Sequence, residues 1–148
     1  MLRDFPFLSP HPGDPKTRPW LFINIMNPQT GLACPTFGLI DTGSDECALP
    51  ASYADLLGHN LTAGEPRQIR TGNGMTTAYR HTCTIQILDV RKLHGEDMQI
   101  AYTIDKILVD FMPNLHCVLL GVNTFLSHFI ITINYHNKTF SIINPEKK

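Results

Sequence analysis

Turn-forming residues divide the chain into many short β-forming runs, and this pattern limits the folds open to it. Runs rich in isoleucine, valine, threonine and aromatic residues alternate with segments containing glycine, proline and asparagine. Two short helices are predicted over 51–57 and 123–128, the second capped by Asn123, and the charged segment 91–97 is predicted as a loop. We expect a closed, barrel-like all-β domain with one or two short helices. The predicted strands are 20–26, 32–40, 46–49, 67–71, 75–89, 98–104, 107–111, 116–120, 130–135 and 139–143.

The first residues differ in composition from the rest of the chain. Residues 1–19 contain five prolines and little periodic signal. They predict an extended N-terminal arm, which either pairs with a partner subunit or is disordered. Residues 20–148 then form the domain proper, because their length suffices for one hydrophobic core.

The charge balance and the cysteines limit which partners and which cellular compartment the sequence is compatible with. Twelve basic residues face 13 acidic ones without a run of either sign, which argues against a nucleic-acid partner. No apolar stretch reaches the roughly eighteen residues of a membrane span, and prolines interrupt the region where a secretory signal would lie. We expect a cytoplasmic protein with no membrane partner. Its cysteines should be free thiols, largely buried: Cys34, Cys47, Cys83 and Cys117.

One motif joins an apolar run to a carboxyl group. The run Phe37-Gly38-Leu39-Ile40 leads directly into Asp41-Thr42-Gly43-Ser44, which occurs once in the chain. Aspartate followed closely by glycine is also common in surface turns. The preceding apolar run argues against a surface loop and places Asp41 at the end of a strand.

Two weaker pieces follow this motif in the sequence. Val118-Leu119-Leu120-Gly121 is an apolar run ending in glycine, which would allow close backbone approach to the Asp41 turn. Gly72-Asn73-Gly74-Met75 lies between two β-forming runs and predicts a hairpin that could close over an extended ligand. Either piece alone also fits an ordinary strand or hairpin.

Together and in this order, the three pieces resemble the retropepsin family of single-domain, homodimeric aspartic peptidases, particularly its bacterial-like members. The resemblance covers roughly residues 20–143. It implies an endopeptidase that acts on extended peptides as a homodimer, without metal or cofactor. It also implies a catalytic turn of Asp41, Thr42, Gly43 and Ser44, and substrate-binding residues Gly72, Asn73, Gly74, Met75, Leu119, Leu120 and Gly121.

The chemistry of peptide hydrolysis explains why a dimer is expected. Water must lose a proton while the leaving nitrogen gains one, and two adjacent carboxyl groups that share a proton do both. The motif supplies one carboxyl, so an identical subunit must supply the other. Thr42 would link the two turns across the dimer axis, and Gly43 would permit the tight turn. We further expect Ser44 to donate a hydrogen bond to Asp41, which would favour the ionised carboxylate and shift the pH optimum towards acid.

The chain departs from the viral pattern at the second motif, and the loops between the two motifs also look longer than in viral members. Viral members usually carry an arginine directly after the second-motif glycine, where it pairs with an acid four residues after the catalytic aspartate. This chain has Val122 opposite Asp45, so that pair is missing. The departure puts the viral style of dimer contact in doubt, rather than the aspartate pair.

Other chemistries have less support in the sequence. His81 and Cys83 lie two residues apart, but no paired zinc-ligand motif occurs. A cysteine–histidine pair built on Cys47 remains open, although a buried core cysteine is the better interpretation. Two functions of different classes therefore remain: a peptidase, or a peptide-binding or dimerisation module that keeps the fold without turnover. The intact Asp41 motif favours the peptidase.

Overall fold

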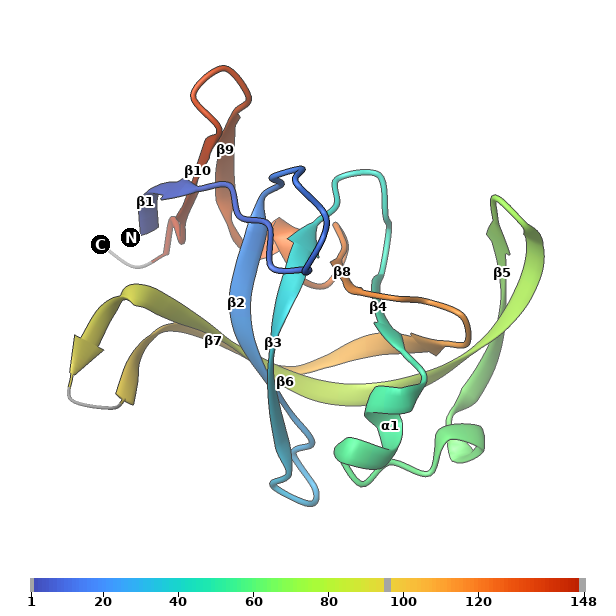
Figure 1. Ribbon diagram of the computed structural model, residues 1–148. Coiled ribbons are helices and arrows are strands. Elements are labelled where there is room, and N and C mark those ends of the chain that lie inside the picture. The colour runs from blue at the N-terminus through green and yellow to red at the C-terminus, as the bar shows by residue number, and fades with distance from the viewer. Residues whose placement is uncertain (1, 95–96, 147–148) are drawn as a thin grey trace.

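The structure is a computed structural model that describes residues 2–94 and 97–146 (Figure 1). Its regular elements are mostly strands, as the alternation of β-forming runs and turns predicts. In chain order they are β1 Leu2–Pro6, β2 Trp20–Met26, β3 Ala33–Ile40, β4 Cys47–Pro50, α1 Ser52–Leu56, η1 Leu61–Ala63, β5 Glu65–Thr71, β6 Gly74–His94, β7 Asp97–Met112, β8 Val118–Leu120, η2 Leu126–His128, β9 Ile130–Asn134 and β10 Thr139–Ile143.

The strands form one closed barrel and one small sheet. The large sheet runs β2-β3-β8-β4-β7-β6-β5, and an additional pairing between β2 and β6 closes its first six strands into a barrel. β5 therefore lies outside the closed ring, and among the described strands it pairs only with β6. The small sheet has the order β1-β10-β9 (Figure 1). The expected all-β, barrel-like fold is confirmed.

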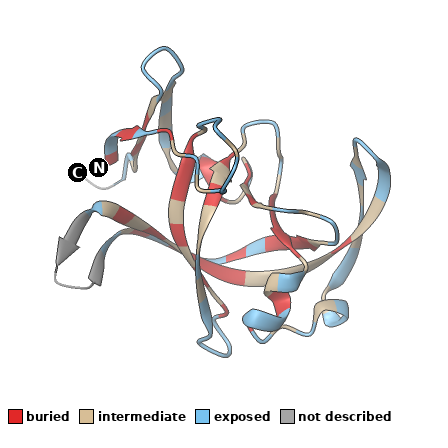
Figure 2. Ribbon diagram, in the orientation of Figure 1, coloured by how far each residue is buried: buried red, intermediate tan, exposed pale blue. Residues whose placement is uncertain are grey.

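Period-two burial builds the core. In β2, Leu21, Ile23 and Ile25 are fully buried, whereas the residues between them are only half-buried. In Figure 2 the buried residues concentrate on the barrel strands, while the hairpin ends are exposed. Each such aliphatic side chain stabilises the fold by about 1.5–3 kcal/mol relative to leaving it in water.

The N-terminal segment packs onto its own chain. β1 pairs antiparallel with β10, and Leu2, Phe5 and Phe7 are buried against the core. A bridge between Leu8 and Arg18 then closes the loop that leads into β2. The segment is therefore ordered here, and its strand partner is β10 of the same chain rather than a second subunit.

Three local predictions were wrong. The strands predicted over 98–104 and 107–111 are one continuous strand, β7. The segment 91–97 is not simply a loop, because β6 continues to His94 and β7 begins at Asp97; residues 95–96 lie outside the described residues. Strands pair through backbone N–H and C=O groups, so charged residues in the sequence do not exclude pairing there. The helix predicted over 123–128 is only the short 3₁₀ turn η2, and Asn123 does not cap it but bonds to Glu46.

Candidate active site

The Asp41 turn is held by its own backbone. The Asp41 N–H donates to the Leu120 carbonyl (3.2 Å), and the Ser44 N–H donates to the Asp41 carbonyl (3.2 Å). The Gly43 N–H donates to Asp41 Oδ1 (3.0 Å) and so orients the carboxylate. Asp41 itself is half-buried. The end of β3 thus presents a fixed carboxylate that solvent and a ligand can reach.

The second motif lies beside this turn, as predicted. β8 runs parallel to β3, with Leu119 opposite Leu39. After β8, the Val122 N–H donates to the Ser44 carbonyl (2.9 Å). Gly121 permits this approach, because a Cβ atom there would lie 2.3 Å from the backbone carbonyl of Glu46.

A cavity of about 730 Å³ opens at the Asp41 turn, and we call it the Asp41 cavity. It lies between the turn, the paired strands β4 and β7 of the barrel, and the strand β5. Its lining comprises Asp41, Gly43, Ser44, Asp45, Glu46, Ala48, Arg67, Gln68, Ile69, Arg70, Thr71, Gly72, Asp110, Met112, Leu119 and Asn123. The first motif, the hairpin and the second motif therefore all contribute residues to the lining of the Asp41 cavity.

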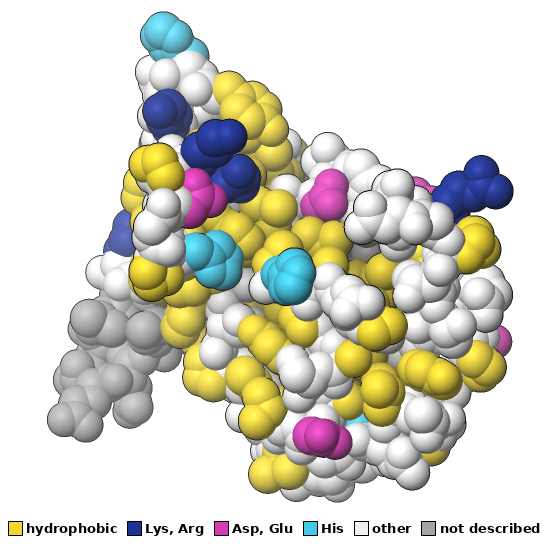
Figure 3. Space-filling view, turned by 45° about the vertical axis from the view of Figure 1, so that its right-hand side comes forward, with side chains coloured by type: hydrophobic (Ala, Val, Ile, Leu, Met, Phe, Trp, Pro, Cys, Tyr) yellow, Lys and Arg dark blue, Asp and Glu magenta, His cyan; other side chains and the backbone are white. Residues whose placement is uncertain are grey.

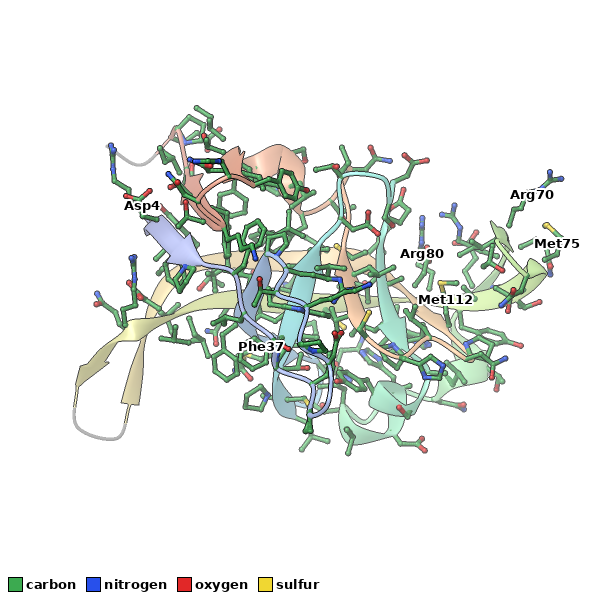
Figure 4. The ribbon with its side chains drawn as sticks, turned by 45° about the horizontal axis from the view of Figure 1, so that its top comes forward. Asp4, Phe37, Arg70, Met75, Arg80 and Met112 are labelled. Atoms are coloured by element: carbon green, nitrogen blue, oxygen red, sulfur yellow. The ribbon has the colours of Figure 1, made fainter. Side chains whose placement is uncertain are left out.

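Some predicted site residues lie outside the cavity lining. Thr42 is exposed on the turn, and the tip residues Asn73, Gly74 and Met75 are exposed. Figure 4 shows Arg70 and Met75 at the end of the β5–β6 hairpin, and Arg80 and Met112 nearer the barrel. Two further residues of the second motif are buried and do not line the cavity: Leu120 and Gly121.

The hydrogen bond expected from Ser44 to Asp41 is not formed. The Ser44 hydroxyl donates instead to the Glu46 carbonyl (2.7 Å), two residues along the same turn. A short local bond of this kind is favoured because serine readily satisfies nearby backbone groups. Ser44 therefore shapes the turn, and the donor to the Asp41 carboxylate is the Gly43 N–H.

A charged network that sequence reasoning missed forms part of the cavity wall. Arg80 from β6 binds Asp110 of β7 through both carboxylate oxygens (3.0 and 3.3 Å), and its Nη2 lies 3.6 Å from Glu46 Oε2. Asp110 is only 1% exposed, and its hydrogen bond is the main reason that the pKa of Arg80 is raised. Asn123 donates to the other Glu46 oxygen (3.2 Å). The network ties the Asp41 turn to the barrel, although position 122 lacks the viral arginine.

Replacing Arg80 by methionine should destabilise the protein by about 2–4 kcal/mol, because the buried Asp110 would lose its counter-charge. The double variant Arg80→Met/Asp110→Leu should recover part of this loss, since no uncompensated charge remains. Urea unfolding of the two single variants and the double variant measures both effects. Losses that simply add would show that the two side chains do not interact.

The described cysteines do not offer a competing nucleophile. Cys47 is buried and accepts a weak bond from the Gly121 N–H (3.4 Å), and burial raises its pKa. Cys83 lies 3.6 Å from His59 Nε2, but burial raises its pKa to about 12, so it is a neutral thiol at ordinary pH. Burial also lowers the pKa of His59, with a smaller contribution from His81. All four cysteines are free, and Cys47 and Cys83 are fully buried, as expected.

The described part of the chain holds neither a metal-binding cluster nor a membrane-spanning helix. Among residues 2–94 and 97–146, no group of three or more histidine, cysteine or acidic side chains is placed to hold a metal ion. Within the same residues, no helix is long and apolar enough to cross a membrane.

The family model described as aspartyl protease matches residues 32–124, which contain the Asp41 motif, the hairpin and the second motif. This match spans more than half of the chain. The protein therefore belongs to the aspartyl protease family, and the resemblance inferred from the motifs is confirmed.

One solved structure supports the fold. A retropepsin-like aspartic protease from Rickettsia conorii matches with a TM-score of 0.55 at 23% sequence identity, over 84% of this chain and 89% of that chain. EIAV protease, solved in complex with the inhibitor HBY-793, matches with a TM-score of 0.41 at 19% identity, over 73% and 85%. No curated protein gave a significant match. The fold is retropepsin-like.

Proposed function

We propose that this protein is an aspartic endopeptidase that is active as a homodimer, with one Asp41 from each subunit. Repulsion between the two carboxyl groups keeps one protonated and leaves the other ionised. The ionised group takes a proton from the attacking water, and the protonated group gives one to the leaving nitrogen. Thr42, Gly43 and Ser44 shape each turn.

The observation that carries this proposal is the position of Asp41 at a large open cavity without a partner of its own. Among the described residues, no second carboxylate hydrogen-bonds to Asp41. Glu46 and Asp110 are held by Arg80, and Asp45 is exposed. A second copy of the chain is therefore the natural source of the missing carboxyl group.

The same proposal assigns the substrate contacts. An extended peptide would lie in the Asp41 cavity on Leu119, with Leu120 and Gly121 supporting the floor beneath it. The hairpin end Gly72–Met75 would close over the peptide as a flap and exclude water. In this proposal residues 20–148 form the peptidase domain, and residues 1–19 form its N-terminal arm.

Incubation with a diverse peptide mixture from about pH 3 to pH 8, with and without a statine-type inhibitor, tests this function. We expect internal cleavage with a bell-shaped pH dependence, blocked by the inhibitor. Mass spectrometry locates the cuts, and light scattering follows the dimer. A stable dimer that binds peptides but cleaves none of them at any pH would favour the non-catalytic module.

Substitution of Ser44 by alanine should leave the pH profile within about half a pH unit of the wild type, because its hydroxyl does not contact the Asp41 carboxylate. The kcat/KM profile of both proteins on one peptide measures the difference. A larger alkaline shift of the acidic limb would show that Ser44 turns towards Asp41 in the active dimer.

A further inference from the structure

The strand β5 contributes two arginines to the lining of the Asp41 cavity, Arg67 and Arg70, and they lie on opposite faces of the strand. Successive residues of a strand point to opposite faces, and directly paired residues point to the same face. Arg67 pairs with Ala78, which is fully buried, so Arg67 lies on the inner face of the hairpin. Arg70 pairs with Met75, which is 60% exposed, and so lies on the outer face (Figure 4).

Arg67 has no acidic partner in this structure. It is half-buried and lines the cavity, yet within residues 2–94 and 97–146 no carboxylate lies within ion-pair distance of it. The nearby acids Glu46 and Asp110 already bind Arg80. On the face shown in Figure 3, basic side chains lie in separate groups with acidic and hydrophobic side chains between them. This face therefore carries no extended electrostatic potential of one sign.

We propose that Arg67 is a specificity-determining residue that binds an acidic side chain of the substrate. The inference rests on the proposed peptidase function and names a substrate class for it: peptides with a glutamate or aspartate flanking the cleaved bond. A guanidinium forms paired, charge-assisted hydrogen bonds with a carboxylate, and closure of the hairpin would remove water from that pair.

The position of Arg67 on the strand indicates which substrate residues it reaches. At about 3.3 Å per residue, it lies roughly 17 Å along β5 from the Gly72 tip. It would therefore meet side chains a few residues from the cleaved bond rather than those at the bond itself. Two-fold symmetry gives one such position on each side of the bond.

Arg67 could instead close the hairpin by pairing with Glu46 across the cavity. The two roles differ in outcome. A closing contact assists every substrate equally, whereas a specificity contact discriminates between substrates.

Peptides with one cleavable sequence and a Glu, Gln or Lys scanned through the flanking positions test the proposal. At about pH 6, where glutamate is ionised, the wild type should cleave the best Glu peptide about three to ten times faster in kcat/KM than its Gln match. The ratio of kcat/KM for the Glu peptide to that for the Gln peptide should fall to about one in Arg67→Gln. The Arg67→Glu variant should instead cleave the Lys peptide fastest. The wild-type preference for Glu should also fade below about pH 4, as the peptide carboxylate is protonated.

Two controls separate the explanations. Lys16→Glu reverses an exposed charge in the N-terminal arm, outside the cavity, and should keep the preference for Glu. Fluorescence anisotropy with Asp41→Asn, with and without Arg67→Gln, should show the same ratios in binding without turnover.

Three results would overturn the role of Arg67: equal cleavage of Glu, Gln and Lys peptides by the wild type, an equal loss on all peptides in Arg67→Gln, or an equal loss of preference in Arg70→Glu. Absence of cleavage in every peptide would instead refute the peptidase function. The binding ratios would then still decide whether Arg67 reads the acidic side chain.

Discussion

Replacement of Asp41 by asparagine should reduce kcat/KM for peptide cleavage by about a thousandfold or more, because an amide can neither share nor transfer the proton. Asparagine has the same shape and keeps a side-chain oxygen that the Gly43 N–H can bind. The backbone bond from residue 41 to the Leu120 carbonyl is unaffected. The variant should therefore fold normally, and a peptide assay with thermal unfolding measures both properties.

The dimer should survive this substitution. Two carboxylates that meet at a two-fold axis repel each other when both ionise, so removal of the charge should leave the dimer dissociation constant unchanged or lower it. Sedimentation at several protein concentrations measures this constant. Asp55→Asn is a matched control, since it makes the same chemical change on the exposed surface of α1, outside the cavity. Activity retained in Asp41→Asn would assign the chemistry to another group.

The sequence predicts the parts of this site that depend on local backbone chemistry. An apolar strand ending in Asp-Thr-Gly, a glycine at the end of a second strand, and asparagine beside glycine in a hairpin each require a particular local conformation. These features are found at Asp41, Gly121 and the β5–β6 hairpin. β2 and both strands of the last hairpin were also predicted, because their apolar residues follow a strong strand pattern.

The parts that sequence reasoning missed depend on register between distant strands. Asp110 lies in an apolar run, which indicates that its carboxylate is buried and needs a partner. Only the pairing of β6 with β7 identifies Arg80 as that partner. The inward position of Arg67 depends in the same way on its pairing with Ala78. The Ser44 hydroxyl had two acceptors within reach along one turn, and the sequence does not distinguish them.

Gly121→Ala should be the most damaging single methyl addition near the site. The added Cβ would lie 2.3 Å from both the carbonyl carbon and oxygen of Glu46 and 2.9 Å from the backbone nitrogen of Cys47. These are backbone atoms that a rotamer change cannot move, so the strands themselves must separate. We expect a loss of about 3 kcal/mol or more in the free energy of unfolding, and a fall of roughly 10 °C in Tm.

Gly72→Ala provides the matched stability control, because beyond its two chain neighbours no atom lies within 4 Å of the Cβ position at the hairpin tip. Its Tm should stay within about 2 °C of the wild type. Separation of the strands at Gly121 would also pull the Val122 N–H from the Ser44 carbonyl and release the Asp41 turn. Any Gly121→Ala protein that still folds should therefore lose activity through kcat. An unchanged Tm and kcat would show that β8 does not pack this closely against the turn, and the Asp41 cavity would then lack the support on which the proposed pair of carboxylates depends.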